Sequence, residues 1–244
     1  QCYNPRPTKT EPDRSTMSRS RYEKFKQVLR QRQHDMTLLT DQVHKGQNIS
    51  AMLRTADAVG IQEIHMVQPS YGHLLYHNTA GGSGRFTGNA VYPDIQSGMA
   101  ELKCRGMHRY AAHWSERAID FREADYTRPF ALIMGAEKHG LSDYAAEHAD
   151  DHVTIPIIGM VESYNVSVAA AIILQEAMFQ RQKAGMYEGK ELDEEDPAVK
   201  DILFRWMHPK LVKYCEKHGL PFPALDEDGD IIPPKDARYR QPGV

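Results

Sequence analysis

Short apolar runs alternate along this sequence with stretches whose apolar residues recur at helical intervals, and the alternation continues from Met36 to Gly185. Such a pattern predicts an α/β layer fold with a mainly parallel sheet. The run from Phe130 to Met134 lies between Pro129 and Gly135 and is apolar throughout, which is typical of a central strand covered on both faces. The sheet is therefore expected to be flanked by helices.

The period of the apolar residues places the individual elements. It predicts strands over residues 36–43, 61–67, 109–112, 130–134 and 152–157, and helices over 48–59, 95–105, 142–149 and 168–185. The segment from Tyr71 to Tyr92 has no regular period and contains a cluster of glycines, so we expect a long connection of functional importance there.

Two terminal parts flank this core. Residues 1–16 are polar and rich in proline, and are expected to be a disordered extension or an expression remnant ahead of a natural start at Met17. Residues 17–35 are predicted to hold a basic helix, residues 36–185 the main domain, and residues 186–244 a helical extension and tail. Pro209 is expected to interrupt the helical pattern that runs through this last part.

The composition allows a sizeable core and argues against a membrane protein. Hydrophobic residues make up 41% of the 244 residues, and charged residues 26%. The longest apolar stretch, Val166 to Leu174, is far shorter than the roughly 20 residues that span a bilayer. Cys2, Cys104 and Cys215 show no metal-ligand spacing, so we expect a reduced, cytoplasmic protein without a metal site.

Positive charge is concentrated near the start of the chain, although the formal net charge is −3. Between residues 19 and 32 a single acid, Glu23, stands among six cations, which are Arg19, Arg21, Lys24, Lys26, Arg30 and Arg32. Tyr22, Phe25 and Leu29 can share one helical stripe there, which predicts an amphipathic helix with its cations pointing outward. The protein can therefore have a basic face although its net charge is negative.

Polar residues interrupt apolar segments at the ends of predicted strands, where open α/β sheets bind their ligands. In the segment 133–141, Gly135 and Gly140 bracket a strand-to-helix turn whose free backbone groups can hold an adenine or a ribose, with Glu137 beside them. The alternative is an ordinary helix entry with a solvated acid.

Two further segments, 48–57 and 155–170, carry polar residues of the same kind. Ser163, Asn165 and Ser167 crowd the start of the last core helix, and because an N-cap needs only one of them, Ser163 and Asn165 suggest hydrogen bonds to a ligand. Arg54 either pairs with Asp57 on the helix surface or grips a phosphate.

The aromatic residues carry no clear signal of their own. Trp114 and Trp206 are predicted to lie in the core or in an interface rather than to serve as base-stacking platforms.

Taken together and in this order, the three segments resemble the three motifs of the SpoU-TrmH family of RNA ribose 2′-O-methyltransferases, in the SPOUT superfamily. Residues 155–170 (IPIIGMVESYNVSVAA) carry the strongest likeness. Further segments resemble the bacterial TrmH group of this family, which methylates guanosine 18 in the tRNA D-loop; they are residues 42–45, 120–123, 125–129, 184–187 and 219–223. The resemblance also implies a deep trefoil knot in the C-terminal part of the sheet domain, which periodicity cannot show.

The resemblance assigns roles to individual residues. It implies S-adenosylmethionine as cofactor and a homodimer packed through the knot region. The catalytic residues that it implies are Arg54, Asn48, Glu137, Ser163 and Asn165, with Arg54 as the key residue. Contacts to the cofactor, mostly through the backbone, are implied for Ala112, Gly135, Ile155 and Tyr164.

The resemblance implies tRNA as the macromolecular partner. The six cations between residues 19 and 32, together with Lys210, Lys213 and Lys217, are then expected to contact tRNA phosphates. Two alternatives stay open at this point: the same chemistry on ribosomal RNA, or an RNA-binding or nucleotide-binding module without catalytic activity.

Overall fold

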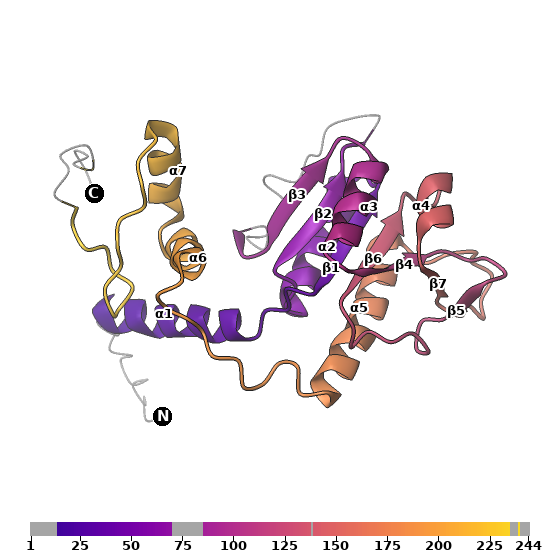
Figure 1. Ribbon diagram of the computed structural model, residues 1–244, viewed down its shortest axis with the longest axis horizontal. Helices are drawn as coiled ribbons and strands as arrows, with labels where there is room; N and C mark the ends of the chain where they lie inside the picture. Colours follow the sequence, from indigo (N-terminus) through magenta and orange to yellow (C-terminus); the bar gives the residue numbers. More distant parts are fainter. Residues whose placement is uncertain (1–13, 70–84, 138, 235–238, 240–244) are drawn as a thin grey trace, which may run out of the picture. The chain divides into compact units, whose positions relative to one another are not determined.

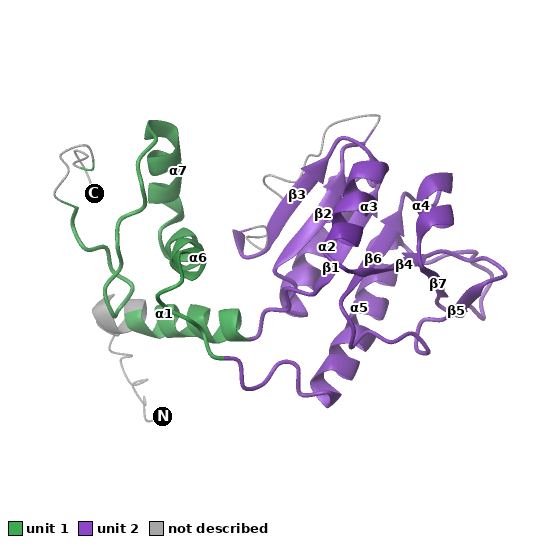
Figure 2. Cartoon of the chain, in the orientation of Figure 1, with its two compact units in different colours: residues 1–30, 191–244 green, residues 31–190 purple. Residues whose placement is uncertain are grey.

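The computed structural model describes residues 14–69, 85–137, 139–234 and 239. Most of the connection expected between Tyr71 and Tyr92 lies outside these residues, as does Cys2. The chain forms two compact units: one consists of residues 1–30 and 191–244, the other of residues 31–190 (Figure 2).

The unit of residues 31–190 contains a seven-stranded sheet in which every pair of neighbours is parallel (Figure 1). Its strands are β1 (Met36–Asp41), β2 (Glu63–Val67), β3 (Gly88–Tyr92), β4 (His108–Ala112), β5 (Ala118–Asp120), β6 (Phe130–Gly135) and β7 (Asp151–Thr154). They lie in the order β3-β2-β1-β6-β4-β7-β5. The predicted α/β class with a parallel sheet is therefore confirmed.

Strand β6 lies at the centre of this sheet, between β1 and β4. Its partners on β1 run from Met36, opposite Phe130, to Asp41, opposite Gly135. Side chains alternate across the strand, so that Leu132 belongs to one hydrophobic core and Ile133 to the other. Two-sided burial explains why this strand is apolar at every position, as expected from its sequence.

One helical layer covers each face of the sheet (Figure 1). Helices α2 (Gly46–Ala58) and α5 (Val166–Lys183) contact each other and share one core. Helices α3 (Ile95–Cys104) and α4 (Asp143–His148) contact each other and share the second core. Ser142 caps α4 as predicted, since its side chain accepts a hydrogen bond from the Ala145 N–H.

Two strands were not predicted, because each has only a short apolar stretch, at residues 90–92 in β3 and 118–119 in β5. Strand β3 is an edge strand whose residues are exposed or half-buried, and β5, at the opposite edge, has three half-buried residues. An edge strand whose side chains are not buried against a helix needs no alternation of apolar and polar residues. Its sequence therefore resembles that of a loop.

The unit of residues 1–30 and 191–244 is helical. It contains α1 (Arg14–Arg30), α6 (Pro197–Met207) and α7 (Pro209–His218). Pro209 stands at the start of α7 and separates it from α6, as predicted. Trp206 is 3% exposed and meets Phe25 edge-on, with ring centroids 5.5 Å apart, so its predicted core position is confirmed. Helix α1 begins at Arg14, ahead of Met17 and inside the extension expected to be disordered.

The cations near the start of the chain do not all point outward. Lys26 is 7% exposed and its ammonium lies 2.8 Å from Glu194. Arg32 is 1% exposed, belongs to the sheet unit, and forms an ion pair with Asp57 at 2.5 Å. The expectation of an outward charge is wrong for these two side chains, because each neutralises a carboxylate within its own unit. Arg19, Arg21 and Lys24 are exposed, and Arg30 is half-buried.

Within the described residues, no helix is both long enough and apolar enough to cross a membrane. Cys104 and Cys215 are free thiols, the first exposed and the second buried. No group of three or more histidine, cysteine or acidic side chains in the described part of the chain is arranged to hold a metal ion.

Arg181 on α5 ties the last core helix to the amino-terminal edge of the sheet. The side chain is fully buried and donates hydrogen bonds to Asp35 Oδ1 at 2.6 Å and to the carbonyl oxygens of Tyr126 at 2.8 Å and Arg128 at 2.9 Å. Its removal would leave the buried carbonyl of Tyr126 without this donor, whereas Asp35, whose side chain is 38% exposed, could turn to solvent.

We therefore expect Arg181→Met to lower the free energy of unfolding by about 1–3 kcal/mol. Urea denaturation followed by far-ultraviolet circular dichroism measures this. The control is Lys183→Met, an exposed cation on the same helix, whose effect should stay within about 0.5 kcal/mol. Equal effects of the two substitutions would contradict a special role for Arg181.

Candidate functional site

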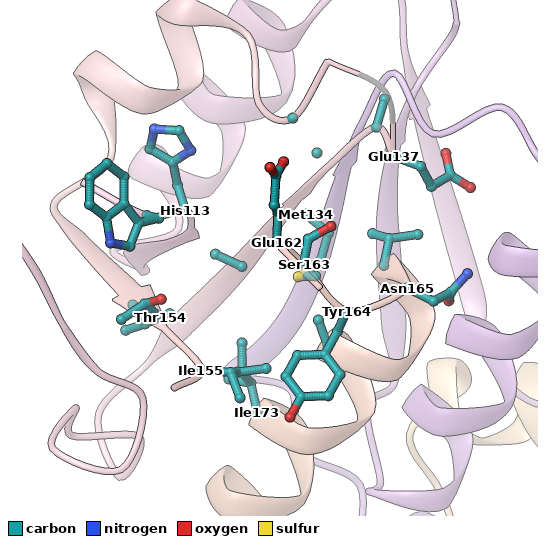
Figure 3. A pocket seen from close by; sticks show the side chains of 18 of the residues that line it. His113, Met134, Glu137, Thr154, Ile155, Glu162, Ser163, Tyr164, Asn165 and Ile173 are labelled. Atoms are coloured by element: carbon teal, nitrogen blue, oxygen red, sulfur yellow. The ribbon is translucent and has the colours of Figure 1, made fainter. Parts of the chain in front are cut away.

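A cavity of about 560 Å³ lies at the carboxyl edge of the sheet, beyond the ends of β4, β6 and β7 (Figure 3). We call it the cradle. Its volume lies within the usual range for small-molecule sites. The predicted site residues that line it are Ala112, Gly135, Glu137, Ile155, Ser163, Tyr164 and Asn165. Segments far apart in the sequence therefore meet here, because parallel strands end at one edge.

A tight turn after β6 forms one wall of the cradle. The Ala136 N–H donates to the Gly140 carbonyl at 2.9 Å, and the Gly140 N–H donates to the Ala136 carbonyl at 2.8 Å. A Cβ at Gly135 would lie 2.2 Å from the carbonyl carbon of Gly140, so no larger residue fits this turn without opening it. Gly140 itself has a φ of +67°, which favours glycine. The two glycines thus bracket the turn, as their spacing predicted.

A hydrogen-bonded chain of side chains joins all three polar segments at this wall. Asn48 Nδ2 donates to Glu137 Oε1, and Asn165 Nδ2 donates to Asn48 Oδ1 at 3.2 Å. The Glu137 side chain is 16% exposed, and its Oε2 atom is buried without a hydrogen bond among the described residues. The interpretation of Glu137 as a solvated acid is therefore wrong. Lys45 Nζ lies 3.7 Å from Glu137 Oε1 at the same wall.

Asn165 performs two tasks at the start of α5. Its Oδ1 atom accepts hydrogen bonds from the N–H of Ser167 at 2.9 Å and from the Ser167 hydroxyl at 2.7 Å, which makes it the N-cap. Its Nδ2 atom remains available for Asn48. Ser163 takes no part in the cap and lines the cradle, where Figure 3 places it beside Glu162, between His113 and Glu137.

Arg54 lies away from the cradle lining. It is exposed on α2 and borders a second cavity of about 910 Å³, together with Ser167 and Val168 of α5. Its predicted surface pairing with Asp57 is wrong, because Asp57 is the partner of Arg32. The structure thus brings together four of the five predicted catalytic residues (Asn48, Glu137, Ser163 and Asn165) and leaves Arg54 on a neighbouring surface.

The wall beyond β4 holds residues that sequence reasoning missed. His113 and Trp114 follow Ala112 directly and line the cradle, and Trp114 is 78% exposed. Trp114 therefore does not lie in the core, and the alternative position in an interface stays a prediction. Burial lowers the pKa of His113, and the nearby His152 and Arg117 lower it further, so the ring is neutral at pH 7. The position of these residues just after a predicted strand was the signal that could have revealed them.

Comparisons with known proteins agree with this arrangement. The model of the SpoU rRNA Methylase family matches residues 35–175, and the model of the SpoU rRNA methylase C-terminal region matches residues 179–234. A tRNA (guanosine(18)-2′-O)-methyltransferase from Escherichia coli strain K12 is 43% identical over 215 residues, which cover 88% of this chain and 94% of the relative.

The chain belongs to the SpoU methylase family.

Solved structures of the SpoU family share its fold. The TrmH/SpoU tRNA modifying enzyme of A. aeolicus matches with a TM-score of 0.70 and 33% identity, over 80% of this chain and 98% of that one. The SpoU methyltransferase AviRb from Streptomyces viridochromogenes, solved in complex with the cofactor AdoMet, matches with a TM-score of 0.56 and 25% identity over 62% of each chain.

The turn after β6 supplies a test of the cradle's geometry. Because a Cβ at Gly135 overlaps backbone atoms, we expect Gly135→Ala to lower the free energy of unfolding by about 1–3 kcal/mol. Gly159→Ala is the matched control, since a Cβ there meets nothing within 4 Å, and its effect should stay within about 0.5 kcal/mol. Denaturant titration of both variants measures the difference. A stable Gly135→Ala protein would show that the turn is looser than described.

Proposed function

We propose that this chain transfers a methyl group from S-adenosylmethionine to the ribose 2′-hydroxyl of guanosine 18 in tRNA. The observation that carries the proposal is the hydrogen-bonded chain of Asn48, Glu137 and Asn165, which unites the three SpoU-like segments at one cradle. The 43% identity to a tRNA (guanosine(18)-2′-O)-methyltransferase, over nearly the whole of both chains, supports tRNA over ribosomal RNA as the substrate.

The cradle suits S-adenosylmethionine in size and in chemistry. Its volume is about 560 Å³, and one wall carries the buried Oε2 atom of Glu137, which accepts no hydrogen bond from the described part of the chain and can attract a cationic ligand. The turn at Gly135 exposes backbone groups to the cavity, and Ala112, Ile155 and Tyr164 border it as well. These four residues would hold the cofactor. When bound, the cofactor supplies an activated methyl group on a sulfonium centre.

The residues of the chain must then bring a weak nucleophile into line and stabilise the negative charge that develops on the 2′-oxygen as its proton passes to solvent water. Asn48 and Glu137 fix each other, and Asn165 is fixed by the helix that it caps, so these side chains reach the site already ordered. Ser163 lies beside them with its hydroxyl available to orient a ribose oxygen. We assign to Arg54 the stabilisation of the developing oxyanion, because a guanidinium stays protonated and serves poorly as a base.

Arg54 can act in this way if two copies of the chain form the site. It does not line the cradle of its own chain, and it borders a cavity next to the apolar side chains Val168 and Phe179, which are 46% and 48% exposed. Other large apolar side chains near the cradle are more exposed still; they are Ile158, Met160 and Val161. Exposed apolar surface of this kind favours a homodimer in which Arg54 of one copy serves the cradle of the other.

The terminal helices complete the proposal. Arg21 and Lys24 on α1, and Lys210, Lys213 and Lys217 on α7, are exposed cations that suit tRNA phosphates. We further propose that the sheet unit is knotted in its C-terminal part, as the resemblance implies, and that the protein acts in the cytoplasm.

Methyl transfer to defined transcripts tests the proposed reaction. With labelled S-adenosylmethionine, a tRNA transcript with guanosine 18 should be methylated, whereas the same transcript with 2′-deoxyguanosine at that position should not. Arg54→Ala should lose at least about 100-fold in rate and retain binding of S-adenosylhomocysteine in calorimetry. Methylation of ribosomal RNA alone would contradict the assigned substrate, and full activity of Arg54→Ala would contradict the assigned mechanism.

Salt dependence tests the proposed RNA surface. The logarithm of the tRNA association constant K decreases linearly with the logarithm of the salt concentration. The magnitude of this slope decreases by about 0.9 for every phosphate that the protein no longer neutralises. We therefore expect Arg21→Gln with Lys24→Gln to weaken tRNA binding and to reduce that slope by about 2. Two controls should leave the slope unchanged. The double variant Arg21→Lys with Lys24→Arg keeps both charges, and Lys103→Gln removes an exposed charge on α3, outside the proposed RNA surface. An unchanged slope in the neutralised variant would exclude α1 from the interface.

A further inference from the structure

Trp114 stands out among the residues that line the cradle. Its side chain is 78% exposed, although it borders a concave site, whereas Trp206 is 3% exposed. Transfer of the apolar surface of such a ring from water to contact with a flat partner is favourable. Exposed aromatic rings at the edge of a cavity are typical of ligand or interface contacts.

The segment that carries Trp114 is held in place by its neighbours. The His113 N–H donates to the Val153 carbonyl at 3.1 Å, and the His113 ring meets the His152 ring edge-on at 5.3 Å. Ser115 Oγ and Arg117 Nη2 lie 2.7 Å and 2.6 Å from the two nitrogens of the His152 ring. Trp114 is therefore presented by an ordered segment, anchored on both sides of it in the sequence.

The two sides of the cradle differ in chemistry (Figure 3). Glu137 and Asn165 lie on one side, where Lys45 Nζ is 3.7 Å from Glu137 Oε1, and Glu162 lies between this side and His113. His113 lies on the opposite side, next in sequence to Trp114, and Ile155 and Ile157 border the same cavity. A ligand with a cationic end and a flat aromatic end can therefore place the aromatic end against His113 and Trp114 and the cationic end toward the carboxylates of Glu162 and Glu137.

We propose that Trp114 is a stacking platform for the adenine ring of the bound cofactor. The proposal rests on the proposed function and adds an aromatic side-chain contact to those proposed above for Glu137 and the backbone of the cradle. The cationic end of the cofactor faces Glu137, and its adenine then falls on the side of His113 and Trp114. Stacking on the exposed indole ring covers apolar surface that no other described residue covers.

The chain offers a direct readout, because its two tryptophans lie in different units. Trp206→Phe leaves Trp114 as the single indole, and titration with S-adenosylhomocysteine should then quench its emission. In the reciprocal variant, Trp114→Phe, only the buried Trp206 remains, and its emission should not change. Calorimetry should show that Trp114→Ala weakens S-adenosylhomocysteine binding by about 5- to 150-fold, and that Trp114→Phe, which keeps a flat ring, weakens it less.

The possible results separate the inference from the proposed function. One result would overturn the inference and leave the proposed function intact. In it, S-adenosylhomocysteine binds with a measurable heat but does not quench Trp114, and Trp114→Ala binds it as tightly as the unsubstituted chain does. Absence of any binding to the unsubstituted chain would overturn the proposed function. Quenching that requires tRNA, or that changes only with protein concentration, would assign Trp114 to an RNA base or to a subunit interface and so also overturn the inference.

Discussion

The parallel course of all seven strands is the constraint on which the site depends. Because of it, the carboxyl ends of β4, β6 and β7 lie at one edge of the sheet. Ala112 ends β4, Gly135 ends β6 and Ile155 follows β7, and all three residues border a single cavity. Both faces of the sheet are covered by helices, so a ligand can approach only from such an edge. The fold thereby converts three distant segments of sequence into one cradle.

Partly buried polar contacts hold this edge in a defined geometry. The chain of Asn48, Glu137 and Asn165 links helix α2, the turn after β6 and the start of α5. Asp41, at the end of β1, is fully buried and accepts a hydrogen bond from the Ser142 N–H at 2.7 Å, which fixes the far end of the same turn. Such contacts add little net stability, but an unpaired partner is costly, so they favour a single arrangement of the site.

The arginine residues of this chain have different roles. Arg32 and Arg181 are fully buried and hold backbone carbonyls and carboxylates together, whereas Arg21 and Arg54 are exposed and available to an anionic partner. A count of cations in a segment cannot separate these tasks. The distinction follows from which arginines have acceptors within their own unit, and it narrows the proposed RNA surface on α1 to a subset of its cations.

The sequence by itself determined the layer class, the central apolar strand, the break at Pro209, and the glycines that bracket the turn after β6, because each follows from local periodicity or backbone freedom. It also placed Asn48, Glu137, Ser163 and Asn165 at strand and helix ends. Tertiary structure alone decided that Lys26 and Arg32 are buried, that Arg54 lies outside the cradle of its own chain, and that Trp114 faces solvent at the rim. These outcomes depend on partners distant in the sequence, such as Glu194 for Lys26 and His152 for the segment around Trp114, and no local pattern encodes them.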